Sequence, residues 1–189
     1  AGKSYTLLLG EAKGEDVYAK AADQPTLYTL KKYVLDRIDH PPADYRDKTL
    51  TKIKEADLAA IDLTVGTEHL TLTHDGDAWK AKGQSLDATK VKPLAGAFEN
   101  LSGSGFAVGV DVAALGLKKP AGEVALHLKD KTTVSLKIGA LTKDGAEYYV
   151  EKAGSPVMRV KKYLVERFLK KPSDLGVTKV AKAEKGKKK

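Results

Sequence analysis

Apolar and polar residues alternate with a period of two in several short stretches of the chain, and this pattern predicts β-strands. One of these stretches contains Asp75-Gly76, a strong signal for a hairpin turn, so Trp79 is expected on the strand after that turn. Strands that follow one another through short turns pair antiparallel. The predicted strand regions are 5–11, 58–66, 69–82 and 122–139.

Helical spacing of apolar residues appears in three other stretches, 27–38, 85–102 and 157–168. In the middle stretch, Ser85 or Asp87 is the expected N-cap. Pro93 is expected to kink this helix or to lie near its start. The residues predicted to face inward are Leu94, Ala97, Phe98 and Leu101. The predicted fold class is α+β, with mainly antiparallel sheets and amphipathic helices packed on one face.

A segment of the chain occurs twice. "LYTLKKYVLDRI" at 27–38 has a close counterpart, "VMRVKKYLVERF", at 157–168. The similarity extends backward to strand-like sequence, where 5–11 parallels 134–140 and 17–25 parallels 148–156. The identical pairs are Lys31/Lys161, Lys32/Lys162, Tyr33/Tyr163, Arg37/Arg167, Pro42/Pro172 and Asp44/Asp174. The sequence therefore predicts an internal duplication, with the same strands and helix in each copy.

The spacing of the copies, about 130 residues, predicts the domain organisation. Residues 1–48 form the latter part of a first repeat unit, and residues 49–177 form a complete second unit. The first copy lacks a counterpart for the strands that open the second, so we expect the natural protein to begin further upstream. Residues 178–189 are rich in lysine and are predicted to be disordered.

The repeated helix has two interpretations. Tyr33 and Tyr163 fall on the apolar stripe of their helices, which predicts that both rings are buried and that Tyr→Ala would cost about 3 kcal/mol at each. A paired substrate site built from Lys-Lys-Tyr is the alternative. The structural interpretation is preferred because periodic apolar positions usually belong to a core.

Composition narrows the function classes. The chain of 189 residues contains no cysteine, which excludes disulfides, thiolate metal sites and cysteine nucleophiles. The formal net charge is +8, but residues 178–189 carry six Lys and one Glu, or +5, which leaves 8 − 5 = +3 for the rest. A nearly balanced body argues against nucleic-acid binding. The tail is suited to electrostatic contact with anionic surfaces, although a solubilising end is the simpler interpretation.

No motif assigns catalytic chemistry or a cofactor. His40, His69, His74 and His127 lack a metal-ligand spacing. The Gly-rich segment 101–109 lacks the Lys-Ser/Thr pair of a phosphate-binding loop and is interpreted as a connection. The sequence therefore assigns no catalytic, cofactor-binding or metal-ligating residue, and no cofactor is expected.

The order of several short blocks resembles the bacterial domain of unknown function 4340, over nearly the whole chain before the tail. The resemblance implies an extracytoplasmic, periplasmic envelope protein, usually with an N-terminal membrane anchor, often encoded beside ABC-type transport components related to gliding motility. No catalytic residues are established for that family, so none is transferred. The blocks are "YRDKTLTKIKEADLAAIDL", "GDAWKA", "LAGAFENLSGSGF", "AALGLKKPAGEVAL", "SLKIGA" and "EYYVEKAGSPVMRV".

Three functions stay open from the sequence. The first is a non-catalytic envelope module, an accessory or scaffold of an ABC-type transport or gliding-related system that acts through contacts with envelope or transporter proteins. The second is a module that binds a ligand or peptide in a groove or at a sheet edge between two similar lobes. The third is a hydrolase that uses paired carboxylates.

Overall fold

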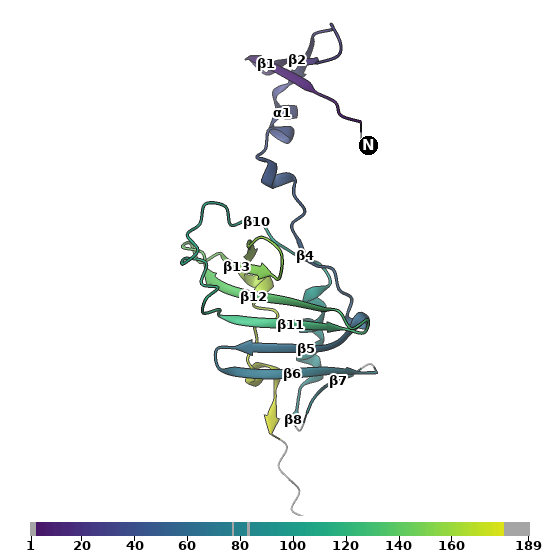
Figure 1. Ribbon diagram of the computed structural model, residues 1–189, viewed down its shortest axis with the longest axis vertical. Helices are drawn as coiled ribbons and strands as arrows, with labels where there is room; N and C mark the ends of the chain where they lie inside the picture. Colours follow the sequence, from purple (N-terminus) through teal and green to yellow (C-terminus); the bar gives the residue numbers. More distant parts are fainter. Residues whose placement is uncertain (1–2, 77, 83, 180–189) are drawn as a thin grey trace, which may run out of the picture. The chain divides into compact units, whose positions relative to one another are not determined.

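The computed structural model of the chain describes residues 3–76, 78–82 and 84–179 (Figure 1). The chain divides into two compact units, Ala1–Arg46 (unit 1) and Asp47–Lys189 (unit 2). Antiparallel sheets and a few short helices make up both units, which confirms the predicted α+β class. No helix within the described residues is long and apolar enough to cross a membrane.

Unit 1 contains one three-stranded antiparallel sheet in the order β1-β2-β3. A β-bulge in β1 lies between Leu9 and Ala12. The buried residues are Val17 and Ala19 on β2. The elements are β1 (Leu7–Lys13), β2 (Asp16–Ala21), β3 (Tyr28–Lys31), the helix α1 (Lys32–Ile38) and the 3-10 turn η1 (Pro42–Tyr45).

Unit 2 is built on a ten-stranded antiparallel sheet in the order β10-β14-β13-β12-β11-β5-β6-β7-β8-β15. A separate pair joins β4 (Thr49–Thr51) to β9 (Leu101–Ser102). The strands of the large sheet are β5 (Leu58–Val65), β6 (Glu68–Asp75), β7 (Ala78–Ala81), β8 (Gln84–Ser85), β10 (Gly105–Phe106), β11 (Gly122–Leu128), β12 (Thr133–Leu141), β13 (Glu147–Lys152), β14 (Met158–Lys161) and β15 (Thr178–Lys179).

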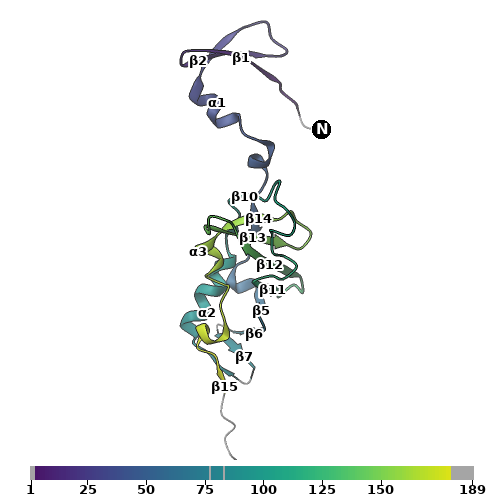
Figure 2. The ribbon, with the colours of Figure 1, turned by 90° about the vertical axis from the view of Figure 1, so that its left-hand side faces the viewer.

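The helices of unit 2, α2 (Ala88–Ala95) and α3 (Lys162–Val165), lie on the same side of the large sheet (Figure 2). The core lies between them and the sheet, where the rings of Phe98 and Phe168 pack with centroids 5.0 Å apart. Three 3-10 turns complete the unit: η2 (Glu55–Asp57), η3 (Gly96–Phe98) and η4 (Pro172–Leu175).

The hairpin and the central helix largely follow the sequence predictions. The predicted hairpin forms, but Asp75 is the last residue of β6 and pairs with Ala78, so the turn lies one residue later than predicted; Gly76 has φ 63°. Asp87 is the N-cap of α2, and its carboxylate accepts a hydrogen bond from the Thr89 amide at 3.0 Å. The helix is shorter than predicted, because it ends at Ala95 and continues only as η3. The four residues predicted to face inward, Leu94, Ala97, Phe98 and Leu101, are all buried.

The duplication is visible in the backbone. β2 pairs with β3 so that Asp16 faces Lys31, and β13 pairs with β14 so that Glu147 faces Lys161. The helix that follows is tied back in the same way, since the Lys32 amide donates to Glu15 O at 2.7 Å and the Lys162 amide to Ala146 O at 3.0 Å. The bulge of β1 also recurs, between Ile138 and Leu141 of β12. Sequence elements 130 residues apart therefore adopt one local fold.

The predicted burial of the repeated tyrosines is wrong. Tyr33 is 59% exposed and Tyr163 is 67% exposed. The prediction extended helical spacing from residue 157, whereas residues 158–161 form β14 and α3 begins only at Lys162. The alternation of the strand sets which side faces the core, so Val160, Val165 and Phe168 are buried and the tyrosine points outward.

The start of the predicted tail also needs correction. Thr178 and Lys179 form β15, which pairs antiparallel with β8, because strand pairing supplies backbone hydrogen bonds that composition alone does not reveal. The remaining tail residues, 180–189, lie outside the described residues. The predicted boundaries of the repeat units, at 48/49 and at 177, stay predictions. The two compact units are defined by contacts between residues, so they do not test where a repeat begins or ends.

Candidate functional site

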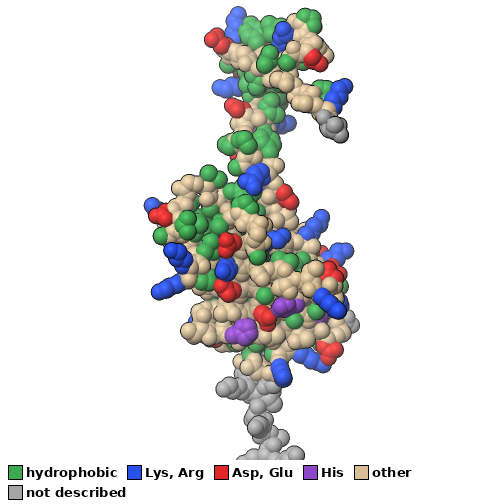
Figure 3. Space-filling view, in the orientation of Figure 1, with side chains coloured by type: hydrophobic (Ala, Val, Ile, Leu, Met, Phe, Trp, Pro, Cys, Tyr) green, Lys and Arg blue, Asp and Glu red, His purple; other side chains and the backbone are tan. Residues whose placement is uncertain are grey.

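The first candidate site is a surface of unit 1, which exposes large apolar side chains from its sheet and helix. Leu7 and Leu9 on β1 are 49% and 44% exposed, Tyr28 on β3 is 51% exposed, and Ile38 at the end of α1 is 45% exposed. Figure 3 shows hydrophobic side chains spread over unit 1. These four residues are called the unit 1 apolar face.

The strand pairing places most of this face on one side of the sheet. Leu9 lies opposite Ala19, and Ala19 lies opposite Tyr28, so the three residues form one row across β1, β2 and β3. Leu7 lies on the same side of β1 as Leu9, because side chains two positions apart on a strand share a face. The result is an apolar surface next to the outer edge of β1, which pairs with β2 alone among the described strands.

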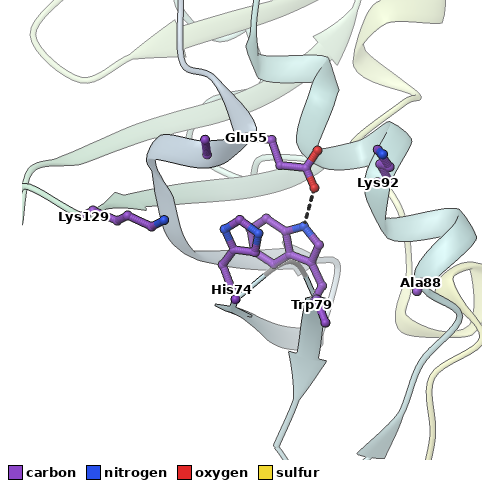
Figure 4. A pocket seen from close by; sticks show the side chains of 9 residues that line it. Glu55, His74, Trp79, Ala88, Lys92 and Lys129 are labelled. Carbon is purple, nitrogen blue, oxygen red and sulfur yellow. Dashed lines mark hydrogen bonds between the residues drawn. The ribbon is translucent and has the colours of Figure 1, made fainter.

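A second candidate site is a pocket of about 580 Å³ in unit 2 (Figure 4). The rings of His74 on β6 and Trp79 on β7 stack with centroids 4.5 Å apart and planes 10° apart. The indole Nε1 donates to Glu55 Oε1 of η2 at 2.9 Å. Lys92 of α2 and Lys129 lie on opposite sides of the ring pair.

The hydrogen bonds of the pocket define what it offers a ligand. His74 Nδ1 lies 3.0 Å from the carbonyl oxygen of Leu58, and a carbonyl only accepts, so Nδ1 carries the hydrogen. In the neutral ring, Nε2 is then an acceptor. Two ammonium groups flank this ring pair, and one carboxylate, Glu55, lines the pocket and accepts from the indole. The two lysines outnumber it, so the pocket is suited to a small ligand with an acidic group.

A third cluster lies on the opposite, outer face of the large sheet. His127 Nε2 lies 2.8 Å from Asp62 Oδ2, and His127 Nδ1 lies 3.1 Å from the Thr133 hydroxyl. Partial burial raises the pKa of Asp62, but hydrogen bonds from Thr71 and His127 outweigh it, so the pKa is below its usual value. The pairing of Asp62 with a histidine 65 positions away was not predicted.

The Thr133 hydroxyl, the His127 imidazole and the Asp62 carboxylate follow one another in the order of a catalytic triad. They share only this order with such a triad. A nucleophile needs oxyanion donors beside it. The hydroxyl belongs to Thr133 at the start of β12, and the two preceding amides are already engaged: Lys131 donates to Leu128 O and Thr132 donates to Asp130 Oδ1. Among the described residues, no group of three or more His, Asp or Glu side chains is arranged to hold a metal ion. The cluster therefore provides no complete catalytic arrangement within the described part of the chain.

Each copy has an acidic residue that forms an ion pair with the first lysine of its "KKY" segment. In unit 2, Glu147 is buried and lies 3.1 Å from Lys161 Nζ and 3.8 Å from Arg159 Nη1. In unit 1, Asp16 lies 2.8 Å from Lys31 Nζ in a more exposed pair. A hydrogen bond with Ser104, then Lys161 and Arg159, lower the pKa of Glu147 against the opposing effect of burial. The first lysine of each "KKY" segment thus has a structural role.

Comparison with protein families gives two matches to one model, described as a domain of unknown function (DUF4340), at residues 1–120 and 109–187. The chain belongs to the DUF4340 family. Because the DUF4340 pattern occurs twice and overlaps at 109–120, it fits the partial repeat seen in the backbone. No curated protein and no solved structure matches the chain.

Sequence patterns did not predict the pocket residues of this DUF4340 chain. The turn signal did not give this pair, because a two-residue turn at Asp75-Gly76 would place Trp79 opposite Leu72. In the structure Asp75 pairs with Ala78, and this register places His74 opposite Trp79. Glu55 and Lys92 come from distant segments, and only the tertiary fold brings them to the rings. The sequence assigned no site residue, so there is no predicted site to compare with the pocket.

Proposed function

We propose that this chain is a non-catalytic, extracytoplasmic envelope module that acts through protein contacts, as an accessory or scaffold component of an ABC-type transport or gliding-related system. The observation that carries the proposal is the unit 1 apolar face, formed by Leu7, Leu9, Tyr28 and Ile38. Large contiguous apolar surface on a folded protein marks interaction sites, because water contact with it is unfavourable. Family membership supports the envelope setting, which the resemblance implied.

Site-specific photocrosslinking in cells of the native organism tests the protein contacts. A photoreactive residue at Tyr28 should crosslink to another protein, while the same residue at Lys143, on the surface of unit 2, should not. Crosslinks of equal yield at both positions, or none at Tyr28, would contradict the proposal. Protease accessibility in spheroplasts tests the compartment, and protection from added protease would contradict the extracytoplasmic location.

The second candidate function is binding of a small acidic ligand in the pocket between Lys92 and Lys129. It is favoured by the fixed ring pair of His74 and Trp79. Trp79 is the single tryptophan of the chain, so intrinsic fluorescence reports directly on this pocket. Titration with small carboxylates and phosphates should change the emission of the unmodified protein, and Lys92→Ala should weaken that response. Unchanged emission at millimolar concentrations would exclude this function.

A further inference from the structure

We propose that the partner of the unit 1 apolar face is a half-repeat: a polypeptide of this family, built like residues 49–131 of this chain, whose last strand pairs antiparallel with β1. This inference rests on the proposed function, since it names the protein that unit 1 binds. It is carried by a residue-by-residue comparison of the two copies.

The strand edges give the first part of the argument. In unit 2, β12 pairs on one side with β13 and on the other with β11, where Val124 faces Leu136 and Gly122 faces Ile138. The counterpart of β12 is β1, which pairs with β2 only, among the strands that the structure describes. Its outer edge presents unpaired backbone groups, which favour the addition of a strand.

The burial of equivalent residues gives the second part. Leu7, Leu9, Tyr28 and Ile38 correspond to residues of unit 2 that are at most 4% exposed. In unit 2 this surface is covered by the first half of the repeat, which contributes β11 beside β12 and Phe98 of η3 against Phe168. The residues that correspond to the unit 1 apolar face are Leu136, Ile138, Met158 and Phe168.

The alternation along β1 gives the third part and specifies the orientation of the partner. Leu8, between the two residues of the apolar face, corresponds to Lys137, which is exposed in unit 2. A half-repeat bound as in unit 2 therefore covers Leu7 and Leu9 but leaves Leu8 in water. A partner that only needed apolar contact would not distinguish these three leucines.

A second copy of the whole chain fits this surface less well. Its strand β11 is already paired with both β12 and β5, so it has no edge to offer. Among the described strands, the edges of its large sheet are β10 and β15, which have two residues each and are too short to pair along β1 as β11 pairs along β12. A strand of its unit 1 offers an edge but brings no equivalent of η3. The half-repeat supplies both the strand and Phe98 together.

The test is to supply the half-repeat covalently. Residues 49–131 are fused ahead of residues 3–189, because residue 132 corresponds to residue 3 and the fusion reproduces the turn between β11 and β12. Hydrogen exchange followed by mass spectrometry compares the β1 amides of the fusion with those of the unfused chain. We expect exchange of the β1 amides to slow by about tenfold or more when the strand is paired.

Two variants of the fusion distinguish this contact from general hydrophobic association. Leu9→Lys should abolish the protection of β1, whereas Leu8→Lys, the matched control, should retain it, because lysine already stands at the equivalent position 137. Equal effects of the two lysines would overturn the inference. So would unprotected β1 amides in the fusion, whether or not the added half-repeat is itself protected.

The outcome can be separated from that of the proposed function. Crosslinking from Tyr28 to a protein in cells, combined with an unprotected β1 in the fusion, would preserve the protein-binding function and reject the half-repeat. Protection in the fusion without any crosslink in cells would preserve the structural fit and reject the proposed function.

Discussion

The two copies of the repeated segment show that one local fold can have two very different environments. Both copies form the same three strands, the same bulge and the same tie between helix and sheet. In unit 2, Ile138 and Phe168 are completely buried, whereas their counterparts Leu9 and Ile38 are about half exposed. The difference teaches that backbone hydrogen bonds and turns specify the local fold, while burial depends on what packs against it.

The largest effect should come from removing the aromatic side chain that only unit 2 buries. Phe168→Ala should lower the free energy of unfolding of unit 2 by about 4 kcal/mol, because it leaves a cavity beside Phe98. Urea denaturation followed by Trp79 fluorescence measures unit 2 alone, since the only tryptophan lies there. Ile38→Ala is the matched change in unit 1 and should leave this transition unchanged. A small effect of Phe168→Ala on the free energy of unfolding would contradict the conclusion that burial distinguishes the two copies.

The ion clusters provide a second contrast. Glu147→Gln should destabilise unit 2 by about 2 kcal/mol, because it removes the charge of a buried carboxylate that pairs with the half-exposed Lys161 and Arg159. Asp16→Asn removes a more exposed pair and should cost at most about 0.5 kcal/mol. Urea denaturation monitored by Trp79 fluorescence measures the first variant, and hydrogen exchange of β2 measures the second. Similar costs for the two variants would show that burial does not separate the copies.

The lowered pKa of Glu147 predicts a pH dependence in unit 2. A carboxyl group whose folded pKa is depressed binds fewer protons in the folded state, so its stabilisation is present above its ordinary pKa and is lost as the pH falls through the folded value. Acid titration of the urea midpoint should therefore show a loss that is smaller in Glu147→Gln. An unchanged acid dependence in that variant would place the loss on other carboxyl groups, including Asp62.

The smallest effect should come from the repeated tyrosines. Tyr33→Ala and Tyr163→Ala should each cost less than about 1 kcal/mol, because both rings are mostly exposed and leave no cavity. Urea denaturation for Tyr163 and hydrogen exchange of unit 1 for Tyr33 provide the measurements. A cost near 3 kcal/mol at either position would show that the tyrosine is buried, as helical spacing predicts.

Local pattern predicted the parts of the fold that depend on neighbouring residues. The hairpin near Asp75-Gly76, a cap at either Ser85 or Asp87 and the inward-facing Phe98 were predicted, because turn chemistry, capping and periodicity act over a few positions. The repeat was also visible, since each copy carries the same succession of signals. The orientation of Tyr163 was not, because it depends on where β14 ends and α3 begins.

In the candidate sites, too, some contacts depend on neighbouring residues and others depend on the tertiary fold. The hairpin that carries His74 and Trp79 was predicted, but their pairing depends on a register one residue away from a turn at Asp75-Gly76. The approach of Glu55 to Trp79, and of His127 to Asp62, joins strands and turns far apart in the chain, and no local pattern specifies such pairs. The sequence by itself determined the strands, the turns and the duplication. Only the tertiary structure decided which copy is buried, because burial is a property of the surrounding elements and the repeated segment is the same kind of structure in both places.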